Sequence, residues 1–323
     1  MSVRRYFKRE SLQHIFQKTT DYGNFLYTIE DSIVLLSILS THAMKYSIDI
    51  HLLCLMTNHF HMLVDAFSKR LLYQYMDVTT SIFVRLYNKR YSRSGKLFHQ
   101  SFGSASKSGE KKIRSCLAYI GNNPVEKHLC KSAIEYKWNL LPYYRNDHPF
   151  SEPLKSYSKR LGYAIKAIKN LRENNEYINY KTLDSLTIRL SITEKKWIYD
   201  FIISIYNPTN YSKSISYYGS YEKMIQAFDS NTGNEYEIKE EYINIPDSVY
   251  STMFKTLKLN GLWSHNLNPY TYTSEQRAMA INLCLKIKDI TKTHLIKFFH
   301  LGIWGNNQVR SEPLGRARAV LDL

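Results

Sequence analysis

Hydrophobic and polar positions of the first 145 residues follow two periods, one typical of strands and one of helices. Alternating or short apolar runs predict strands over residues 12–20, 50–56 and 59–64, and a loop that leads into a strand within residues 92–102. Apolar positions that share one helical face predict helices over residues 29–46, 71–91 and 109–122. The last helix is expected to stop at Asn123-Pro124, because a residue before proline avoids helical geometry. Strands interleaved with helices in this order favour a small α+β domain with an antiparallel sheet.

Beyond residue 150 the pattern becomes helical. We expect a basic helical linker over residues 151–185, a helical domain over residues 186–310 and a tail over residues 311–323, where the composition changes abruptly. Within the helical domain, the segments 281–287 and 291–301 are typical of a helix-turn-helix, whose second helix would contact DNA. Two amphipathic helices joined by a polar turn are also ordinary core structure, so this interpretation stays open.

The amino-acid composition indicates what kind of partner the protein binds. The 323 residues carry a formal charge of +16 and a pI near 9.4, which favours a polyanionic partner. No stretch has the length of a membrane span, and residues 1–9 lack the apolar core of a signal peptide. The four cysteines form no C-x-x-C pair, which is typical of buried thiols in a reducing compartment. We therefore expect a cytoplasmic or nucleoid-associated protein without a membrane partner.

A pair of histidines marks the predicted strand at residues 59–64. His59 and His61 share one face of that strand, whereas Phe60, Met62 and Val64 share the other. Two imidazoles on adjacent positions of one face can hold a divalent cation, as an enzyme acting on nucleic acids requires at the scissile phosphate. His-x-His also occurs by chance at strand edges, so the pair alone decides nothing.

A tyrosine in the third predicted helix is a candidate nucleophile. Tyr119 sits beside the apolar stripe of this helix, and Asn123 lies one turn further on the same side. A tyrosine hydroxyl has an ordinary pKa of about 10, so it needs a metal or a base nearby to act as a nucleophile. With 27 tyrosines in the chain, a tyrosine beside a helix stripe is more often a residue at the edge of the core.

Basic and aromatic residues alternate at the end of the second predicted helix and in the following loop. Cations of this kind contact phosphates, and the interleaved rings of Tyr87 and Tyr91 could stack on bases. A solvated helix end is the alternative. The residues that we predict to bind DNA are Arg85, Lys89, Arg90, Arg93, Lys96, Phe98 and His99.

Four short sequences, in this order, resemble the REP-associated tyrosine transposases, a branch of the single-tyrosine HUH transposases. They are Met56-Thr57-Asn58-His59-Phe60-His61, Tyr87-Asn88-Lys89-Arg90, Arg93-Ser94-Gly95-Lys96-Leu97-Phe98 and Tyr119-Ile120-Gly121-Asn122-Asn123-Pro124-Val125. The resemblance covers residues 1–145. It implies a single-tyrosine transposase/nuclease domain over residues 1–150, with a ferredoxin-like α+β fold whose helices lie on one face of the sheet.

The resemblance also implies a reaction. His59 and His61 would bind Mg²⁺ or Mn²⁺, with Asn123 as a third ligand. Tyr119 would attack a phosphodiester of single-stranded, hairpin-forming DNA and form a 5′-phosphotyrosine link. Some relatives exchange active-site helices between two subunits, so a second copy of the chain is a candidate partner.

Three departures from the family pattern leave this set of residues intact. Thr57 replaces a proline, Ser101 replaces an arginine, and Gly121 is expected to loosen the end of the helix. Two other functions remain open. One is a domesticated regulator that binds hairpin DNA without catalysis. The other is an RNA-binding module, because a similar sheet serves RNA recognition.

Overall fold

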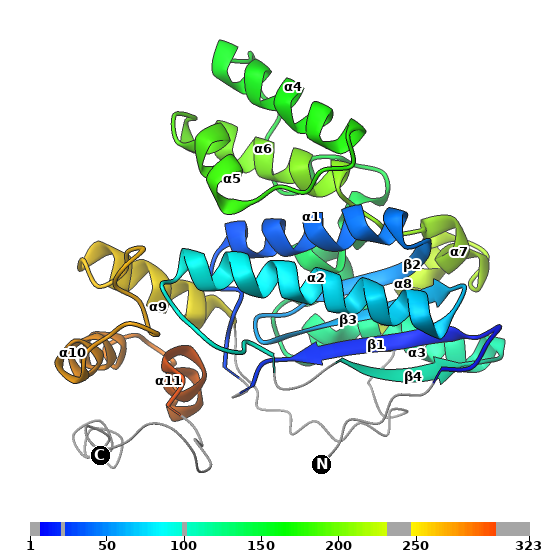
Figure 1. The fold of residues 1–323 in the computed structure, drawn as a ribbon, viewed down its shortest axis with the longest axis horizontal. Coiled ribbons are helices and arrows are strands. Elements are labelled where there is room, and N and C mark those ends of the chain that lie inside the picture. Colours follow the sequence, from blue (N-terminus) through cyan, green and yellow to red (C-terminus); the bar gives the residue numbers. More distant parts are fainter. Residues whose placement is uncertain (1–6, 21–22, 99–101, 231–246, 302–323) are drawn as a thin grey trace.

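The N-terminal half builds one antiparallel sheet and three long helices. The computed structural model describes residues 7–20, 23–98, 102–230 and 247–301. The strands are β1 (Leu12–Lys18), β2 (Ile48–Leu55), β3 (His59–Ala66) and β4 (Gly103–Lys107). The helices are α1 (Ile29–Lys45), α2 (Lys69–Arg90) and α3 (Glu110–Glu126). The strand order β2-β3-β1-β4, with every pair antiparallel, confirms the predicted ferredoxin-like α+β fold (Figure 1).

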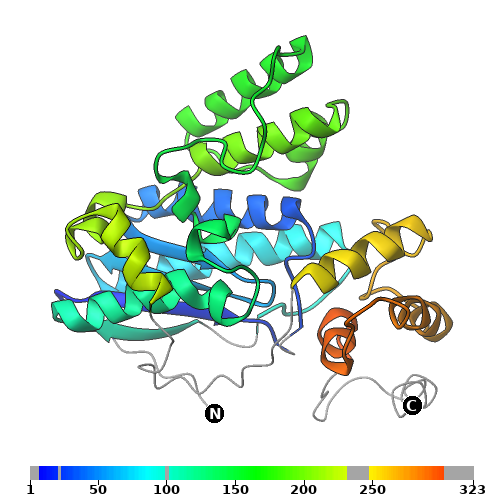
Figure 2. The same cartoon turned by 180° about the vertical axis from the view of Figure 1, so that it is seen from behind.

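Helices cover both faces of this sheet. The strand residues Ile15, Phe60 and Met62 share a hydrophobic core with α1 and α2. Leu12 and Leu63 point the other way and pack with α3. The expectation that all helices lie on one face is therefore wrong, as the views from opposite sides show (Figures 1 and 2). The reason is that β1, β2 and β3 carry apolar side chains on both faces, so each face needs a cover.

Two predicted boundaries are corrected by the structure. The fourth strand begins only at Gly103, because Leu97 and Phe98 are buried in the core from a loop rather than from a strand. Helix α3 continues through Pro124 to Glu126. Near a helix end, a proline removes a single backbone hydrogen bond. The amide of Lys127 still donates to the carbonyl of Asn123 at 3.1 Å, so the last turn survives.

The rest of the described chain is helical, as predicted. Three short 3-10 turns follow α3: η1 (Ala133–Glu135), η2 (Lys137–Asn139) and η3 (Leu141–Tyr144). The helices after them are α4 (Lys159–Glu173), α5 (Tyr180–Thr187), α6 (Ile192–Ile205), α7 (Tyr211–Ser216), α8 (Tyr221–Asp229), α9 (Asp247–Leu259), α10 (Ser274–Cys284) and α11 (Lys292–Phe299). The pattern did not predict α5 and α7, which have only eight and six residues.

These helices join three different cores. Helices α4, α5 and α6 belong to the same hydrophobic core as α1. Helix α8 instead packs with α3 on the opposite face of the sheet. Helices α9, α10 and α11 form a core of their own beside the N-terminal half (Figure 1). The predicted boundaries at residues 150, 185 and 310 stay predictions, and residues 311–323 lie outside the described residues.

A buried carboxylate ties three of these helices together. Asp31, in the first turn of α1, accepts hydrogen bonds from the hydroxyls of Tyr91 (2.8 Å) and Tyr180 (2.7 Å). It also accepts from the backbone amides of Tyr27 (3.0 Å) and Thr28 (2.9 Å). Burial raises the pKa of Asp31 to about 6, although these donors lower it. The cluster joins α1 to α5 and to the end of α2.

The described helices do not suit a membrane span. None of the helices in the described ranges combines the length and the apolarity needed to cross a bilayer. The four cysteines are free thiols, and burial raises the pKa of Cys54 well above its ordinary value.

Candidate active site

Strand β3 places both predicted histidines on the face that α3 covers. His61 pairs with Phe16 of β1 in the antiparallel register, and His59 pairs with Lys18. The imidazole centroids of His59 and His61 are 4.8 Å apart. Both side chains are buried, with exposed fractions of 5% and 0%. A β-carbon at Gly103, opposite Phe16, would collide with the Phe16 ring, so this glycine lets that ring lie over β4.

Helix α3 brings Tyr119 to this pair. The Tyr119 ring lies 5.3 Å from that of His61, centroid to centroid, in an edge-on arrangement. Only 3% of the tyrosine is exposed. Sequence positions 58 residues apart therefore meet in one chain, and the two histidines and the tyrosine predicted from the sequence form one cluster.

A third histidine belongs to the cluster and was not predicted. His14 of β1 is fully buried, its Nε2 lies 3.1 Å from Nδ1 of His61, and its ring is 5.8 Å from that of Tyr119. A histidine at a buried strand position was the available signal, but the antiparallel register that brings it to His61 could not be read from the sequence. Hydrogen bonding at Nδ1 fixes the tautomer and the ring orientation of a histidine that binds through Nε2.

Asn58 contacts Nδ1 of His59, as His14 contacts Nδ1 of His61. Its side-chain oxygen lies 2.6 Å from Nδ1 of His59. An amide oxygen only accepts, so Nδ1 of His59 donates the proton and Nε2 keeps its lone pair. The turn before the strand thus orients the first histidine, and His14 orients the second.

Asn123, the predicted third ligand, is a buried amide of helix α3. It is fully buried one turn after Tyr119, and neither Oδ1 nor Nδ2 has a hydrogen-bond partner within the described part of the chain. A buried amide without partners is costly, which makes Asn123 a candidate ligand rather than a packing residue. Among the described residues, no group of three or more His, Cys, Asp or Glu is placed to hold a metal.

Segments that follow α3 in the chain hold the tyrosine helix in place. A β-carbon at Gly121 would collide with the ring of Phe228, so the glycine lets α8 pack directly on α3. The Tyr218 hydroxyl donates to the Arg114 carbonyl at 2.8 Å, and the Asn139 amide donates to the Gly121 carbonyl at 3.2 Å. Gly121 was expected to loosen this helix, but it permits the contact that fixes it.

The predicted basic and aromatic residues separate into two groups. Tyr87, Tyr91 and Phe98 are buried in the core of α1 and α2, so the expectation that they stack on bases is corrected. Arg90 forms a 2.6 Å ion pair with Asp184 of α5. The exposed cations are Arg85, Lys89 and Lys96.

The remaining DNA-contact predictions are untested. Arg93 donates to the Asn88 side chain and to the Lys96 carbonyl, so its guanidinium braces the loop. His99 lies outside the described residues. Because α2 covers the face opposite the histidines, exposed cations at its end lie away from the face that carries Tyr119.

The predicted helix-turn-helix falls on α10 and α11. His294, Leu295, Phe298 and Phe299 of α11 are buried. The Phe298 carbonyl accepts from the Tyr27 hydroxyl at 2.8 Å, which turns this side of α11 toward the N-terminal half. DNA contact by this pair stays a prediction.

Comparison with known proteins gave two matches. A solved structure described as "Structure of the REP associates tyrosine transposase bound to a REP hairpin" is 13% identical, with a TM-score of 0.35. The match covers 49% of this chain and 95% of that one. None of the curated proteins matches. Residues 11–123, about a third of the chain, match the family model "Transposase IS200 like". The resemblance to the single-tyrosine transposases is therefore confirmed for the segment that holds the whole sheet, His59, His61 and Tyr119.

Proposed function

We propose that this protein is a metal-dependent single-tyrosine DNA transposase, which nicks and rejoins single strands of hairpin-forming DNA. The observation that carries the proposal is the meeting of Tyr119 with His61 and His59 on one buried face, within a segment that matches transposases. The formal charge of +16 supports DNA as the partner.

Tyr119 is the group that bonds to DNA. Its hydroxyl oxygen attacks the phosphorus of the scissile phosphodiester. The new O–P bond replaces the bond to the 3′ oxygen, which leaves and takes up a proton as the 3′-hydroxyl, while the tyrosine hydroxyl loses its own proton. The 5′-phosphotyrosine keeps the energy of the broken bond, so the reverse attack by a 3′-hydroxyl rejoins a strand without ATP.

The residues on this face fit a divalent cation. His59 and His61 would supply two nitrogens, and the unpaired Oδ1 of Asn123 would supply an oxygen. When bound, Mg²⁺ or Mn²⁺ provides Lewis-acid chemistry at a phosphate oxygen. The protein itself orients the two imidazoles, because Asn58 contacts Nδ1 of His59 and His14 contacts Nδ1 of His61.

Tyr119 serves the histidines of its own chain in this proposal. In the structure, the rings of Tyr119 and His61 of one chain lie 5.3 Å apart, centroid to centroid, which supports a site formed within a single copy. Mixing Tyr119→Phe protein with a His59→Ala, His61→Ala double variant tests this. We expect no activity from the mixture, and recovered activity would show exchange of helices in a homodimer.

The direct test is covalent capture. Labelled single-stranded hairpin DNA from the flanks of the gene, incubated with Mn²⁺, should give a slow-migrating species on a denaturing gel. It should disappear in Tyr119→Phe and with a chelator, and it should persist in the control Tyr217→Phe, a tyrosine outside the cluster. Hairpin binding without any adduct would favour the regulator, and a preference for RNA hairpins would favour the RNA-binding module.

A further inference from the structure

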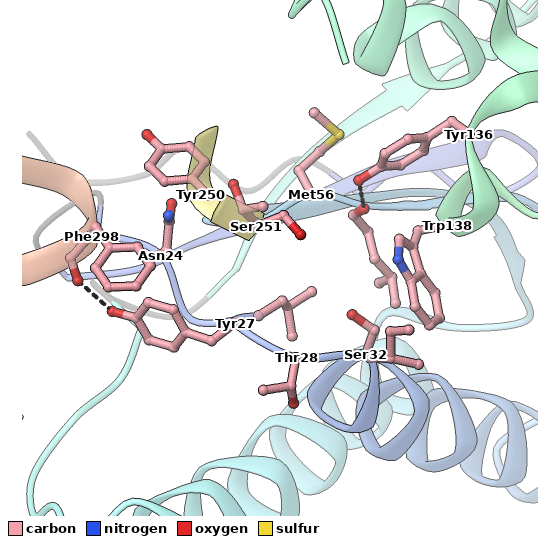
Figure 3. Close-up of a pocket in the computed structure, with 14 residues that line it drawn as sticks. Asn24, Tyr27, Thr28, Ser32, Met56, Tyr136, Trp138, Tyr250, Ser251 and Phe298 are labelled. Atoms are coloured by element: carbon pink, nitrogen blue, oxygen red, sulfur yellow. Dashed lines mark hydrogen bonds between the residues drawn. The ribbon is translucent and has the colours of Figure 1, made fainter. Parts of the chain in front are cut away.

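A cavity of about 190 Å³ lies where α9 and α11 meet the N-terminal half (Figure 3). A volume of this size corresponds to about six water molecules, so it suits one small ring system rather than a drug-sized ligand. Five aromatic residues contribute to the lining: Tyr27, Tyr136, Trp138, Tyr250 and Phe298.

The polar ends of two of these rings are already engaged. The Tyr27 hydroxyl donates to the Phe298 carbonyl at 2.8 Å, and the Tyr136 hydroxyl donates to the Leu55 carbonyl at 2.9 Å. Both bonds hold the wall together, as Figure 3 shows. What these rings offer a ligand is therefore aromatic surface, which favours a planar partner.

None of the described residues that line the cavity has a charged side chain, which favours a neutral ligand over a phosphate. The lining does carry a buried side-chain amide, besides the hydroxyls of Thr28, Ser32, Thr57 and Ser251. Asn24 is 2% exposed, and its Oδ1 has no hydrogen-bond partner in the part of the chain that the structure describes. A buried acceptor of this kind selects a ligand with an N–H donor. A neutral, planar ring with an N–H group is the description of a nucleobase.

The cavity adjoins the histidine pair along the chain. Met56 and Thr57 line it, and the Met56 amide donates to the His59 carbonyl at 2.8 Å. Thr57 and His59 are two residues apart, so their Cα atoms are separated by at most about 7 Å. Tyr136 and Met56 also share the hydrophobic core that contains Tyr119. A strand whose phosphate lies at the histidines therefore has bases next to the cavity.

We propose that this cavity receives one unpaired nucleobase of the single-stranded DNA, close to the scissile phosphate. The C-terminal helices thus add a base-binding site, through Tyr250, Ser251 and Phe298, to the segment that matches transposases. This inference rests on the proposed function, since it takes single-stranded DNA as the substrate.

The experiment combines removal of a base from the DNA with a substitution that fills the cavity, and asks whether the two effects depend on each other. Ser251 is an exposed lining residue on α9, and Ser251→Trp should obstruct the cavity. Thr252→Trp, at the next exposed position and outside the lining, is the matched control. The substrates are hairpin DNA strands in which single bases near the cleavage position are removed one at a time. Dissociation constants and adduct formation are measured for each pair of protein and DNA.

We expect one abasic position to weaken wild-type binding about tenfold, the scale of one lost base–aromatic contact. Ser251→Trp should weaken binding of intact DNA by a similar factor and show no further loss at that position, whereas Thr252→Trp should behave as wild type. If the two losses multiply at every position, the cavity does not hold a base. Should Ser251→Trp fail to fold, Asn24→Leu supports the same coupling test.

The two proposals can fail separately. Adduct formation by the wild-type protein, without coupling at any position, overturns the base-binding cavity and supports the chemistry. Coupling without any adduct supports the cavity and overturns the proposed function.

Discussion

Two buried polar clusters in the described part of the chain differ in how completely their atoms are paired. The Asp31 carboxylate accepts four hydrogen bonds, two from tyrosine hydroxyls and two from backbone amides. On the other face of the sheet, a tyrosine and three histidines lie together. Asn123, one helical turn after that tyrosine, has no hydrogen-bond partner among the described residues. A paired cluster stabilises the fold, whereas an unpaired buried amide costs stability and needs another reason to exist. The difference favours a structural role for the first cluster and, in the proposed function, a chemical role for the second.

The same substitution, tyrosine to phenylalanine, made in each cluster tests this comparison most directly. Tyr119→Phe should abolish the covalent DNA adduct and change the free energy of unfolding by less than about 1 kcal/mol. Tyr180→Phe should leave the adduct and lower the free energy of unfolding by about 1–3 kcal/mol, because the Asp31 carboxylate loses a donor. Denaturant unfolding and the gel assay read the two effects. An adduct formed by Tyr119→Phe, or its loss in a folded Tyr180→Phe, would reverse the assignment.

Asp31 predicts a pH dependence. Its pKa is about 6 in the folded protein and near 3.8 in the unfolded chain, so the folded state binds the proton more tightly. Ionisation therefore costs stability as pH rises from about 4 to 6, by on the order of 3 kcal/mol in total.

The neutral variant Asp31→Asn isolates this effect. Its stability relative to wild type should improve between pH 4 and pH 7, as followed by denaturant unfolding at each pH. A constant difference across that range would show that the carboxyl titrates normally.

Asn123→Leu separates ligation from packing. Removing the unpaired amide should leave the free energy of unfolding unchanged or raise it. Adduct formation should fall about 10- to 100-fold at limiting Mn²⁺, if Asn123 is a ligand. A stability loss of several kcal/mol with normal activity would place Asn123 among the structural residues. Asn123→Asp, which keeps an oxygen at the same position, should retain more activity than the leucine variant.

The smallest effect is expected at His14, which acts through His61. His14→Gln should reduce adduct formation about tenfold, and higher Mn²⁺ should recover part of it, because a less well oriented imidazole binds more weakly. His51→Gln is a matched control: this buried histidine lies on β2, and burial lowers its pKa. A Mn²⁺ dependence unchanged by His14→Gln would leave His14 a packing residue.

The sequence was sufficient for features that depend on local period and failed where distant segments meet. The strand around His59 and the helix around Tyr119 follow from apolar spacing, and both lie where predicted. The role of His14 depends on the register between β1 and β3, and that of Gly121 on the packing of Phe228, more than a hundred residues away. Tyr87 and Tyr91 were misassigned because an aromatic residue next to a cation looks the same whether the ring is exposed or buried.

The contact between Gly121 and Phe228 also bears on how the protein is made. The Tyr119 helix is finished long before Phe228 leaves the ribosome, and until then one of its faces lacks its cover. In the proposed function, the nicking site is therefore complete only after roughly two thirds of the chain has been synthesised. A fragment ending near residue 150 would keep His59, His61 and Tyr119 and still lack the support that holds them together. In the proposed function, we therefore expect an interrupted translation product to be a poor nuclease.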